Sequence, residues 1–265
     1  MNSSHRLAEL RWPDASDELK ASVVVVPTGA TEQHGHHLPL ETDTLLVTAV
    51  ADRSATKARE HATNVYVAPP LPVGYSPHHM DFAGTLSVAS EVFSGLVKGT
   101  VRSLWRHGCR KIFVLNGHGG NANLLKAALQ DLRFEDEIRA AGASYWDFVI
   151  DFIQDWRNSG PGGINHACEM ETSLMLAVAP ELVRPERAED TSWAPQSCFI
   201  SEDLTIGAPV SVNWSHAELH PSGSLGAPLQ ASAERGAQLL DEITARISQF
   251  LTEFQGWNWD DPRSL

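Results

Sequence analysis

The chain has 265 residues, of which 42% are hydrophobic, a fraction typical of a globular protein that buries a substantial core. Its net charge of −13, from 33 acidic and 20 basic residues, argues against nucleic acid or an anionic membrane as a partner. The three cysteines lack CxxC spacing and no apolar run approaches the roughly 20 residues of a membrane span, which disfavours a disulfide framework and a membrane protein. Because the N-terminus also lacks the apolar stretch of a signal peptide, we expect a cytoplasmic protein.

Strand-like and helix-like patterns alternate along the chain. Short apolar runs predict strands at residues 22–27, 64–68, 111–115 and 143–148. Amphipathic patterns predict helices at residues 44–61, 88–107, 121–141 and 168–179, and a last helix at 231–254. This alternation is typical of βαβ units, so we expect a single α/β domain over residues 1–265 with a mostly parallel sheet. The loop-rich region 183–228 would cover a site or form an oligomer contact.

Carboxylates and imidazoles gather directly after the first predicted strand. In an extended segment residues two apart point to the same side, so Glu32 and His34 can face one point in space. Asp43 follows a loop and opens the next predicted helix. Oxygen and imidazole ligands that converge at the end of a buried strand suit zinc or manganese, which predicts a metal site.

The segment Asn116–Asn121 follows another predicted strand and is rich in glycine. His118 should lie beyond the carboxyl end of that strand, where ligands bind in open α/β sheets. Gly119 would allow substrate to approach the backbone closely. A phosphate-binding loop is disfavoured because neither a GxGxxG pattern nor a Lys-Ser/Thr ending is present. We therefore interpret His118 as a metal ligand.

A third cluster opens the helix predicted at residues 168–179. His166 and Glu169 are three residues apart and would share one helix face, whereas Glu171 lies about 160 to 200° away from Glu169. This spacing favours Glu169 as a ligand and Glu171 as a structural partner. The alternative is an acidic first turn stabilised by the helix dipole. Cys168 as a thiol nucleophile is disfavoured because no base follows it.

Three further residues are candidates for substrate contact. Ser76 and His79 lie in the loop after the second predicted strand and offer a hydroxyl and an imidazole. Trp146, at the end of the fourth predicted strand, would form an apolar wall of the pocket. The alternatives are a solvated loop side chain for His79 and a core aromatic for Trp146.

Four segments together resemble the creatininase (creatinine amidohydrolase) family. TEQHGHHLPLETDT (31–44), NGHGGN (116–121) and HACEMETS (166–173) are similar to three family signatures, in the family's order, and GYSPHHMDFAGTLS (74–87) is similar to its substrate-side segment. The likeness covers about residues 20–180, with weaker similarity near residues 234–236. The resemblance implies a three-layer α/β sandwich with a mostly parallel central sheet flanked by helices. It also implies a two-metal centre, with zinc, manganese or both, in a homo-oligomer that is usually a hexamer.

Carried over by position, the resemblance assigns Glu32, Asp43 and His118 to one metal ion. His34 and Asp43, as a bridging ligand, would hold the second ion together with one further carboxylate. In creatininase itself that carboxylate stands two residues after the histidine of the NGH motif. This chain has Gly120 there, so the resemblance points to a carboxylate of the third signature.

Members with the NGHGGN form take the missing ligand from the third signature, which here indicates Glu169, a residue we also assign to the catalytic centre. His166 matches the histidine that carries protons in the family. Asn165 stands where creatininase has a glutamate, and Cys168 stands where the family usually has glycine. Together with Gly120, these departures make creatinine itself a doubtful substrate.

We therefore expect a metal-dependent amidohydrolase that acts on a carbon–nitrogen bond other than a peptide bond. Its substrate would be a small amide, cyclic amide or formamide, attacked by a hydroxide that bridges two metal ions. The alternatives are a lactone, ester or short-peptide hydrolase on the same centre, and a non-catalytic protein that binds a metal or a small ligand. A site with one metal ion also remains open if Glu169 does not reach the centre.

Overall fold

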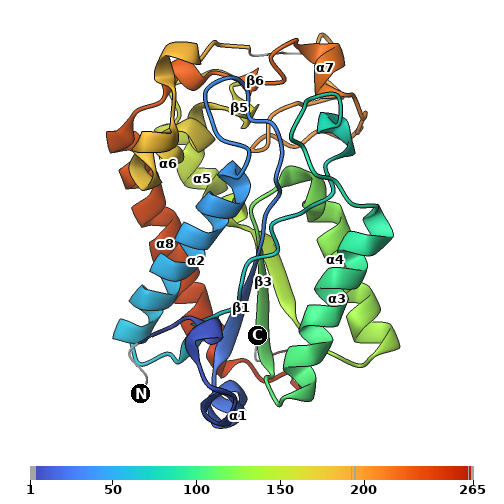
Figure 1. The fold of residues 1–265 in the computed structure, drawn as a ribbon, viewed down its shortest axis with the longest axis vertical. Coiled ribbons are helices and arrows are strands. Elements are labelled where there is room, and N and C mark those ends of the chain that lie inside the picture. The colour runs from blue at the N-terminus through green and yellow to red at the C-terminus, as the bar shows by residue number, and fades with distance from the viewer. Residues whose placement is uncertain (1–3, 192, 194, 262, 264–265) are drawn as a thin grey trace.

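A four-stranded parallel sheet forms the centre of the protein, whose computed structural model describes residues 4–191, 193, 195–261 and 263 (Figure 1). The strands are β1 (Val23–Thr28), β2 (Val65–Val67), β3 (Lys111–Asn116) and β4 (Ala141–Ser144), and their order in the sheet is β2-β1-β3-β4. All three strand pairs are parallel. The sheet is mostly apolar because helices cover both of its faces.

Helices cover the two faces of the sheet and give the sandwich three layers (Figure 1). One face packs against α2 (Thr42–Glu60), α5 (Ile150–Trp156), α6 (Glu169–Val178) and α8 (Ala233–Gly256). The other packs against α3 (Ser90–Arg106) and α4 (Ala122–Glu135), with α1 (Trp12–Ala21) near the amino ends of the strands. The predicted fold class is therefore confirmed.

Side chains of each strand alternate between two separate cores. In β1, Val23 and Val25 belong to the core beneath α2 and α8, whereas Val24 and Val26 belong to the core beneath α3 and α4. This alternation follows from the two-residue period of a strand. Each core fixes the position of one helical layer against the sheet.

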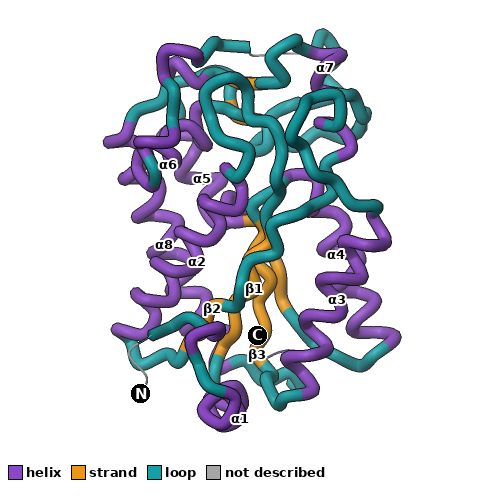
Figure 2. The backbone as a smooth tube through the Cα atoms, in the orientation of Figure 1, coloured by secondary structure: helices purple, strands orange, loops and turns teal. Residues whose placement is uncertain are grey.

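A long, mostly irregular cap lies over the carboxyl ends of the strands (Figure 2). It contains β5 (Ile164–His166) and β6 (Leu225–Gly226), which pair antiparallel, and the short helix α7 (His216–Leu219). The loop-rich region predicted at residues 183–228 falls within this cap. No helix among the described residues is long and apolar enough to span a membrane.

Three predicted elements differ from the structure. Residues 145–148 form a 3₁₀ helix and not the end of a strand, because Ser144 and Asp147 form a capping box that begins it. The helix predicted at residues 121–141 is α4, which ends at Glu135 and does not reach residue 141, since Glu137 adopts a left-handed conformation with φ of 58°. His166 lies on β5 and not on the helix, which begins only at Glu169.

Candidate metal centre

The carboxyl ends of β1 and β3 bring two of the predicted clusters together. Thr28 of β1 pairs with Asn116 of β3, so the loops that follow both strands leave the sheet at the same edge. His118 stands two residues beyond β3, and the loop after β1 carries Glu32. The register of two buried strands therefore places the first two signatures side by side.

Two asparagines shape the turn that carries His118. The Asn116 side chain accepts a hydrogen bond from the His118 amide at 3.2 Å and donates to the His118 carbonyl oxygen at 2.7 Å. The Asn121 side chain accepts from the Tyr75 amide at 3.0 Å and donates to the Gly29 carbonyl oxygen at 3.1 Å. Both asparagines of NGHGGN are therefore structural, and they fix the loops around the histidine.

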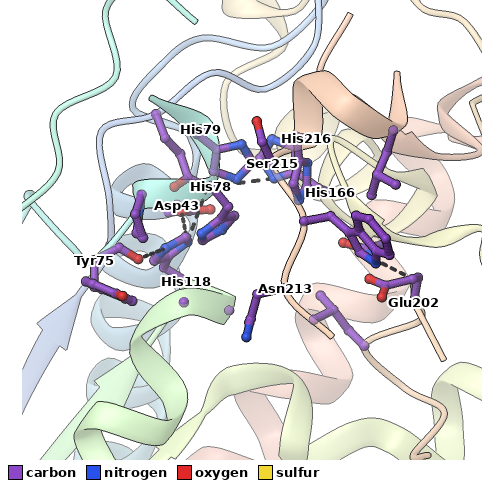
Figure 3. Close-up of a pocket in the computed structure, with 18 of the residues that line it drawn as sticks. Asp43, Tyr75, His78, His79, His118, His166, Glu202, Asn213, Ser215 and His216 are labelled. Atoms are coloured by element: carbon purple, nitrogen blue, oxygen red, sulfur yellow. Dashed lines mark hydrogen bonds and ion pairs between the residues drawn. The ribbon is translucent and has the colours of Figure 1, made fainter. Parts of the chain in front are cut away.

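The His118 ring faces two carboxylates. Its Nε2 donates to the Tyr75 carbonyl oxygen at 3.0 Å, so Nδ1 presents a lone pair to the opposite side. That Nδ1 lies 3.2 Å from Glu32 Oε1 and 3.1 Å from Asp43 Oδ2. Figure 3 shows His118 and Asp43 on the same side of the pocket, with the hydrogen bond to Tyr75 drawn as a dashed line.

The His34 ring has the same arrangement on the other side of Asp43. Its Nδ1 donates to the Glu32 carbonyl oxygen at 3.1 Å, so the lone pair of the ring is on Nε2 and faces Asp43. Nε2 lies 3.1 Å from Asp43 Oδ1 and 3.7 Å from Glu171 Oε1. Asp43 therefore directs one carboxylate oxygen at each histidine, which is the geometry of a bridging ligand.

The donor set fits a pair of divalent metal ions. Glu32 Oε1, Glu32 Oε2 and Asp43 Oδ2 are buried and receive no hydrogen bond, a costly state for carboxylate oxygens without a cation. His34 and His118 each donate their remote N–H to a backbone carbonyl, as metal-ligating histidines almost always do to an outer partner. Mixed imidazole and carboxylate ligands suit zinc and manganese.

The electrostatics of the cluster also favour a cation. Burial opposes the charged form of His34, but Asp43 and Glu171 outweigh it and hold the His34 pKa well above its usual value. For His118, burial is likewise outweighed by Glu32 and Asp43, and its pKa is also raised. The carboxylates thus favour a positive charge in a buried site, and a metal ion bound there would take the place of the ring protons.

The structure brings Glu171, and not Glu169, to this cluster. Ligand atoms of His34, Asp43 and Glu171 lie within 4.8 Å of one another. The Glu169 carboxylate points elsewhere and accepts hydrogen bonds from the amides of Asn158 and Ser159 at 2.8 and 2.9 Å. The sequence-based choice of Glu169 as fifth ligand and catalytic carboxylate is therefore replaced by Glu171.

The local backbone explains this correction. Because His166 ends β5 and Ala167 turns the chain with a left-handed φ of 50°, His166 and Glu169 never share a helix face. Cys168 is the N-cap of α6, and Glu171 Oε2 accepts from the Cys168 amide at 3.2 Å. Its other oxygen, Oε1, is left to face His34. The helical spacing rule was sound, but it was applied to a residue outside the helix.

Gly120 shows why a carboxylate cannot come from the NGHGGN loop. A Cβ at this position would lie 2.3 Å from the Tyr75 carbonyl oxygen and 2.6 Å from His118 Nε2. Since Tyr75 and His118 are hydrogen-bonded to each other, a side chain there would break the contact that orients the ring. The position therefore requires glycine in this chain, and the carboxylate that lies with His34 and Asp43 is Glu171 of α6.

His166 lies beside the cluster with a defined orientation. Its Nε2 donates to the Gln33 carbonyl oxygen at 2.6 Å, so Nδ1 faces Glu32 Oε1 at 3.7 Å. Burial, followed by repulsion from His34 and His216, holds the pKa of His166 well below its usual value. The ring is therefore neutral near pH 7 and can accept a proton at Nδ1.

The Gln33 side chain ties several loops together around His166. Its Nε2 donates to His79 Nδ1 and to the Gly223 carbonyl oxygen, both at 2.8 Å, and its Oε1 accepts from the Gly35 amide at 2.8 Å. His79 Nε2 is thereby aimed at Glu32 Oε1, 3.3 Å away. Sequence reasoning did not single out Gln33, although it stands between two predicted ligands.

The residues predicted to contact substrate have separate positions. Trp146, His79 and Gly119 line a cavity of about 520 Å³ above the cluster, a size that accommodates a small molecule. Ser76 does not line it: the residue is fully buried and its hydroxyl lies 3.2 Å from His118 Nε2. Cys168 is also fully buried and outside the cavity, and burial raises its pKa well above the usual value, which leaves the thiol unreactive.

The cap supplies pocket residues that the sequence did not reveal. The segments 201–204 and 212–216 line the cavity and include Glu202, Trp214 and His216. His78 joins them from the loop after β2, and burial lowers the pKa of His78 to about 3 and that of His216 to about 4. These rings are therefore neutral at pH 7. No spacing pattern marked these residues, because irregular loops bring them to the site.

A parallel α/β sandwich with a carboxylate–imidazole cluster at the carboxyl ends of its strands is the setting of a metal-dependent hydrolase. A family model described as creatinine amidohydrolase matches residues 8–251. The chain is 32% identical to the creatinine amidohydrolase of Pseudomonas putida, an alignment that covers 96% of this chain and 98% of that protein. It is 35% identical to the mycofactocin precursor peptide peptidase of Mycobacterium ulcerans, with 86% and 85% covered.

A solved structure described as creatininase Mn has a TM-score of 0.78 to this chain, with 32% sequence identity and coverage of 94% of this chain and 98% of that one. The chain therefore belongs to the creatininase family of hydrolases. The resemblance found in the three signatures is confirmed.

Proposed function

We propose that the protein is a metal-dependent amidohydrolase that cleaves a small amide, cyclic amide or formamide. The observation that carries this proposal is the set of buried carboxylate oxygens without hydrogen bonds, which face imidazole lone pairs beneath a cavity of small-molecule size. Family membership supports a hydrolase, and the departures at Gly120 and Asn165 argue against creatinine itself as the substrate.

Glu32, Asp43 and His118 would hold one divalent ion, and His34, Asp43 and Glu171 would hold a second. Zinc or manganese suits these ligands, and a relative of known structure is described as a manganese form. Two such ions, when bound, lower the pKa of a water molecule towards neutrality and polarise the substrate carbonyl. The protein's own contribution is to exclude bulk water and to present both carboxylate oxygens of Asp43.

His166 would move the proton that amide cleavage requires. Its neutral Nδ1 accepts a proton as water adds to the amide carbon, and the same atom returns that proton to the leaving nitrogen when the carbon–nitrogen bond breaks. The Gln33 carbonyl holds Nε2–H throughout, so the ring need not rotate between the two steps. Water thus supplies its oxygen to the acyl product and its proton to the amine.

A short peptide is the second candidate substrate. The relative from Mycobacterium ulcerans is named as a peptidase that acts on a precursor peptide, and it is 35% identical to this chain. The chemistry of amide cleavage would be unchanged, and only the acyl and amine groups in the cavity would differ. The homo-oligomer, the hexamer and the cytoplasmic location remain predictions.

Turnover and metal content measured together test the proposal. Protein stripped with a chelator and reloaded with manganese or zinc is assayed for release of ammonia, amine or formate from simple amides, cyclic imides, formamides and dipeptides. We expect activity only after reloading, with about two equivalents of metal bound. A protein that binds two equivalents and cleaves none of these bonds would contradict the proposed reaction.

A further inference from the structure

The cavity wall opposite the cluster carries a carboxylate without a cationic partner. Glu202 lies across the pocket from Asp43 and His118, and Asn213 lies between them (Figure 3). No lysine or arginine among the described residues forms an ion pair with Glu202. The carboxylate is half-buried, and burial raises its pKa, whereas the Asn165 amide lowers it in part. Its negative charge is therefore left for a ligand.

The backbone around Glu202 is held in place. The Glu202 carbonyl oxygen accepts from the Asn165 side chain at 2.6 Å, and the Leu204 amide donates to the Ile164 carbonyl oxygen at 2.9 Å. Between them, the buried Asp203 accepts from Arg157 at 2.8 Å. A carboxylate on such a fixed segment keeps its position against the cavity without a large cost in conformational entropy.

The rest of the wall has the chemistry of a cation site. Trp146 and Trp214 line the same cavity, and aromatic faces attract ammonium and guanidinium groups. No lysine or arginine is among the described residues that line the cavity. Burial lowers the pKa of His78, His79, His166 and His216, so these four rings are neutral at pH 7, and the fifth, His118, faces Glu32 and Asp43. Apart from the proposed metal ions and the His118 ring beside them, the described lining offers an anionic ligand only uncharged donors such as Asn213 and Ser215.

We propose that the substrate carries a cationic group, such as an ammonium, amidinium or guanidinium, on the side remote from the scissile amide, and that Glu202 binds it. This inference rests on the proposed amide hydrolysis for the position of the scissile bond. It excludes phosphorylated and carboxylated amides as good substrates, because Glu202 would repel them and no lysine or arginine of the described lining would compensate.

Three probes of matched length test the inference by binding: 4-aminobutanamide, its neutral counterpart pentanamide, and the anionic glutaramate. Dissociation constants are measured by calorimetry in the metal-free and the manganese-loaded protein. We expect the cationic amide to bind about tenfold more tightly than the neutral one in both forms, as an ion pair supported by aromatic faces allows. Equal affinities, or no binding of the cationic probe, overturn the inference.

Glu202→Gln removes the charge and nearly preserves the shape. We expect it to abolish the preference for the cation while the affinity for pentanamide and the thermal midpoint stay unchanged. Glu186→Gln, at an exposed carboxylate that does not line the cavity, is the matched control and should keep the preference. A cation preference that survives in Glu202→Gln overturns the inference, because the cation would then bind elsewhere.

Ammonia release from the same probes separates the two proposals. If amides are cleaved without regard to charge and Glu202→Gln changes nothing, the cation site is wrong and the amidohydrolase stands. If no amide is cleaved but Glu202 determines which probe binds, the reaction is wrong and the cation site stands. The expected result is faster release from 4-aminobutanamide than from glutaramate, reversed or levelled in Glu202→Gln.

Discussion

Asp43 is the residue whose loss should disturb the centre most, because each of its oxygens faces a different histidine. A metal ion at 100 times its dissociation constant stabilises a protein by about 2.7 kcal/mol. One kcal/mol raises the thermal midpoint of a chain near this size by about 2–4 °C. Each site should therefore contribute about 5–11 °C, and two sites together about twice that shift.

Asp43→Ala should lose the metal-induced shift of both sites, whereas Glu171→Gln should lose that of one. The assay is thermal unfolding of each chelator-treated protein with and without manganese, so that a change in intrinsic stability cancels. Elemental analysis of the same samples should give about two equivalents in the wild type, about one in Glu171→Gln and almost none in Asp43→Ala. An Asp43→Ala protein that keeps two equivalents and the full shift would refute the bridging role.

Four further substitutions separate chemistry from structure. Glu169→Gln should retain its metal but lose about 1.5–3 kcal/mol of unfolding free energy in denaturant titration, because the buried Glu169 carboxylate accepts hydrogen bonds from two backbone amides. Loss of metal in this variant would show that Glu169 is a metal ligand after all. His166→Ala should keep its metal and lose about 10²–10⁴-fold in kcat; an empty centre in a folded protein would refute its role in proton transfer. Gln33→Ala should lower kcat by about 10–100-fold with metal content unchanged, since it holds His79 and the loop at Gly223; unchanged kinetics would mean that these contacts do not matter. Asp203→Asn should lower the free energy of unfolding by about 3–5 kcal/mol at pH 7, because it breaks the buried ion pair with Arg157. The difference from wild type should shrink as the pH falls below about 4. The reason is that burial raises the Asp203 pKa, but Arg157 and Thr205 outweigh burial and lower it overall. A pH-independent difference in thermal midpoint would contradict this last assignment.

The sign of the Asp203 prediction follows from the direction of its shift. A carboxylate whose folded pKa lies below its unfolded value stabilises the fold fully above the unfolded pKa. That contribution is lost as the pH falls through the lower, folded pKa. Acid should therefore weaken the attachment of the segment that carries Glu202 in the wild type and leave Asp203→Asn less affected.

Hydrophobic periodicity was sufficient to predict the alternating strands and helices and the mostly parallel sheet, whereas the three-layer arrangement was predicted from the family resemblance. The valines of β1 and the apolar side of α8 gave unambiguous patterns, because each packs against a large core with a fixed period. The end of the fourth strand was misplaced because the capping box of Ser144 and Asp147 acts over one turn only, which hydrophobic periodicity cannot detect.

Four of the five residues predicted as ligands do converge: Glu32, His34 and His118 lie in the loops after β1 and β3, whose register is fixed, and Asp43 lies in the first turn of α2. The fifth failed for a local reason: the left-handed turn at Ala167 separates His166 from α6. A non-glycine residue in that conformation leaves no spacing signal. The sequence-based assignment therefore reversed the two glutamates: it made Glu171 the structural partner, whereas in the structure Glu169 holds backbone amides and Glu171 lies at the cluster.

The pocket wall was beyond the reach of sequence patterns. Glu202, Trp214 and His216 come from a segment held by side-chain to backbone contacts and not by periodic burial. Such contacts depend on where other loops end, so they are visible only once the sheet and α6 have positioned β5 and β6.

An anomalous difference map from crystals of the metal-loaded protein tests the central claim most directly. It should show two peaks beside Asp43, one towards Glu32 and His118 and the other towards His34 and Glu171. A single peak, or a peak coordinated by Glu169 in place of Glu171, would contradict the two-metal centre proposed for this chain.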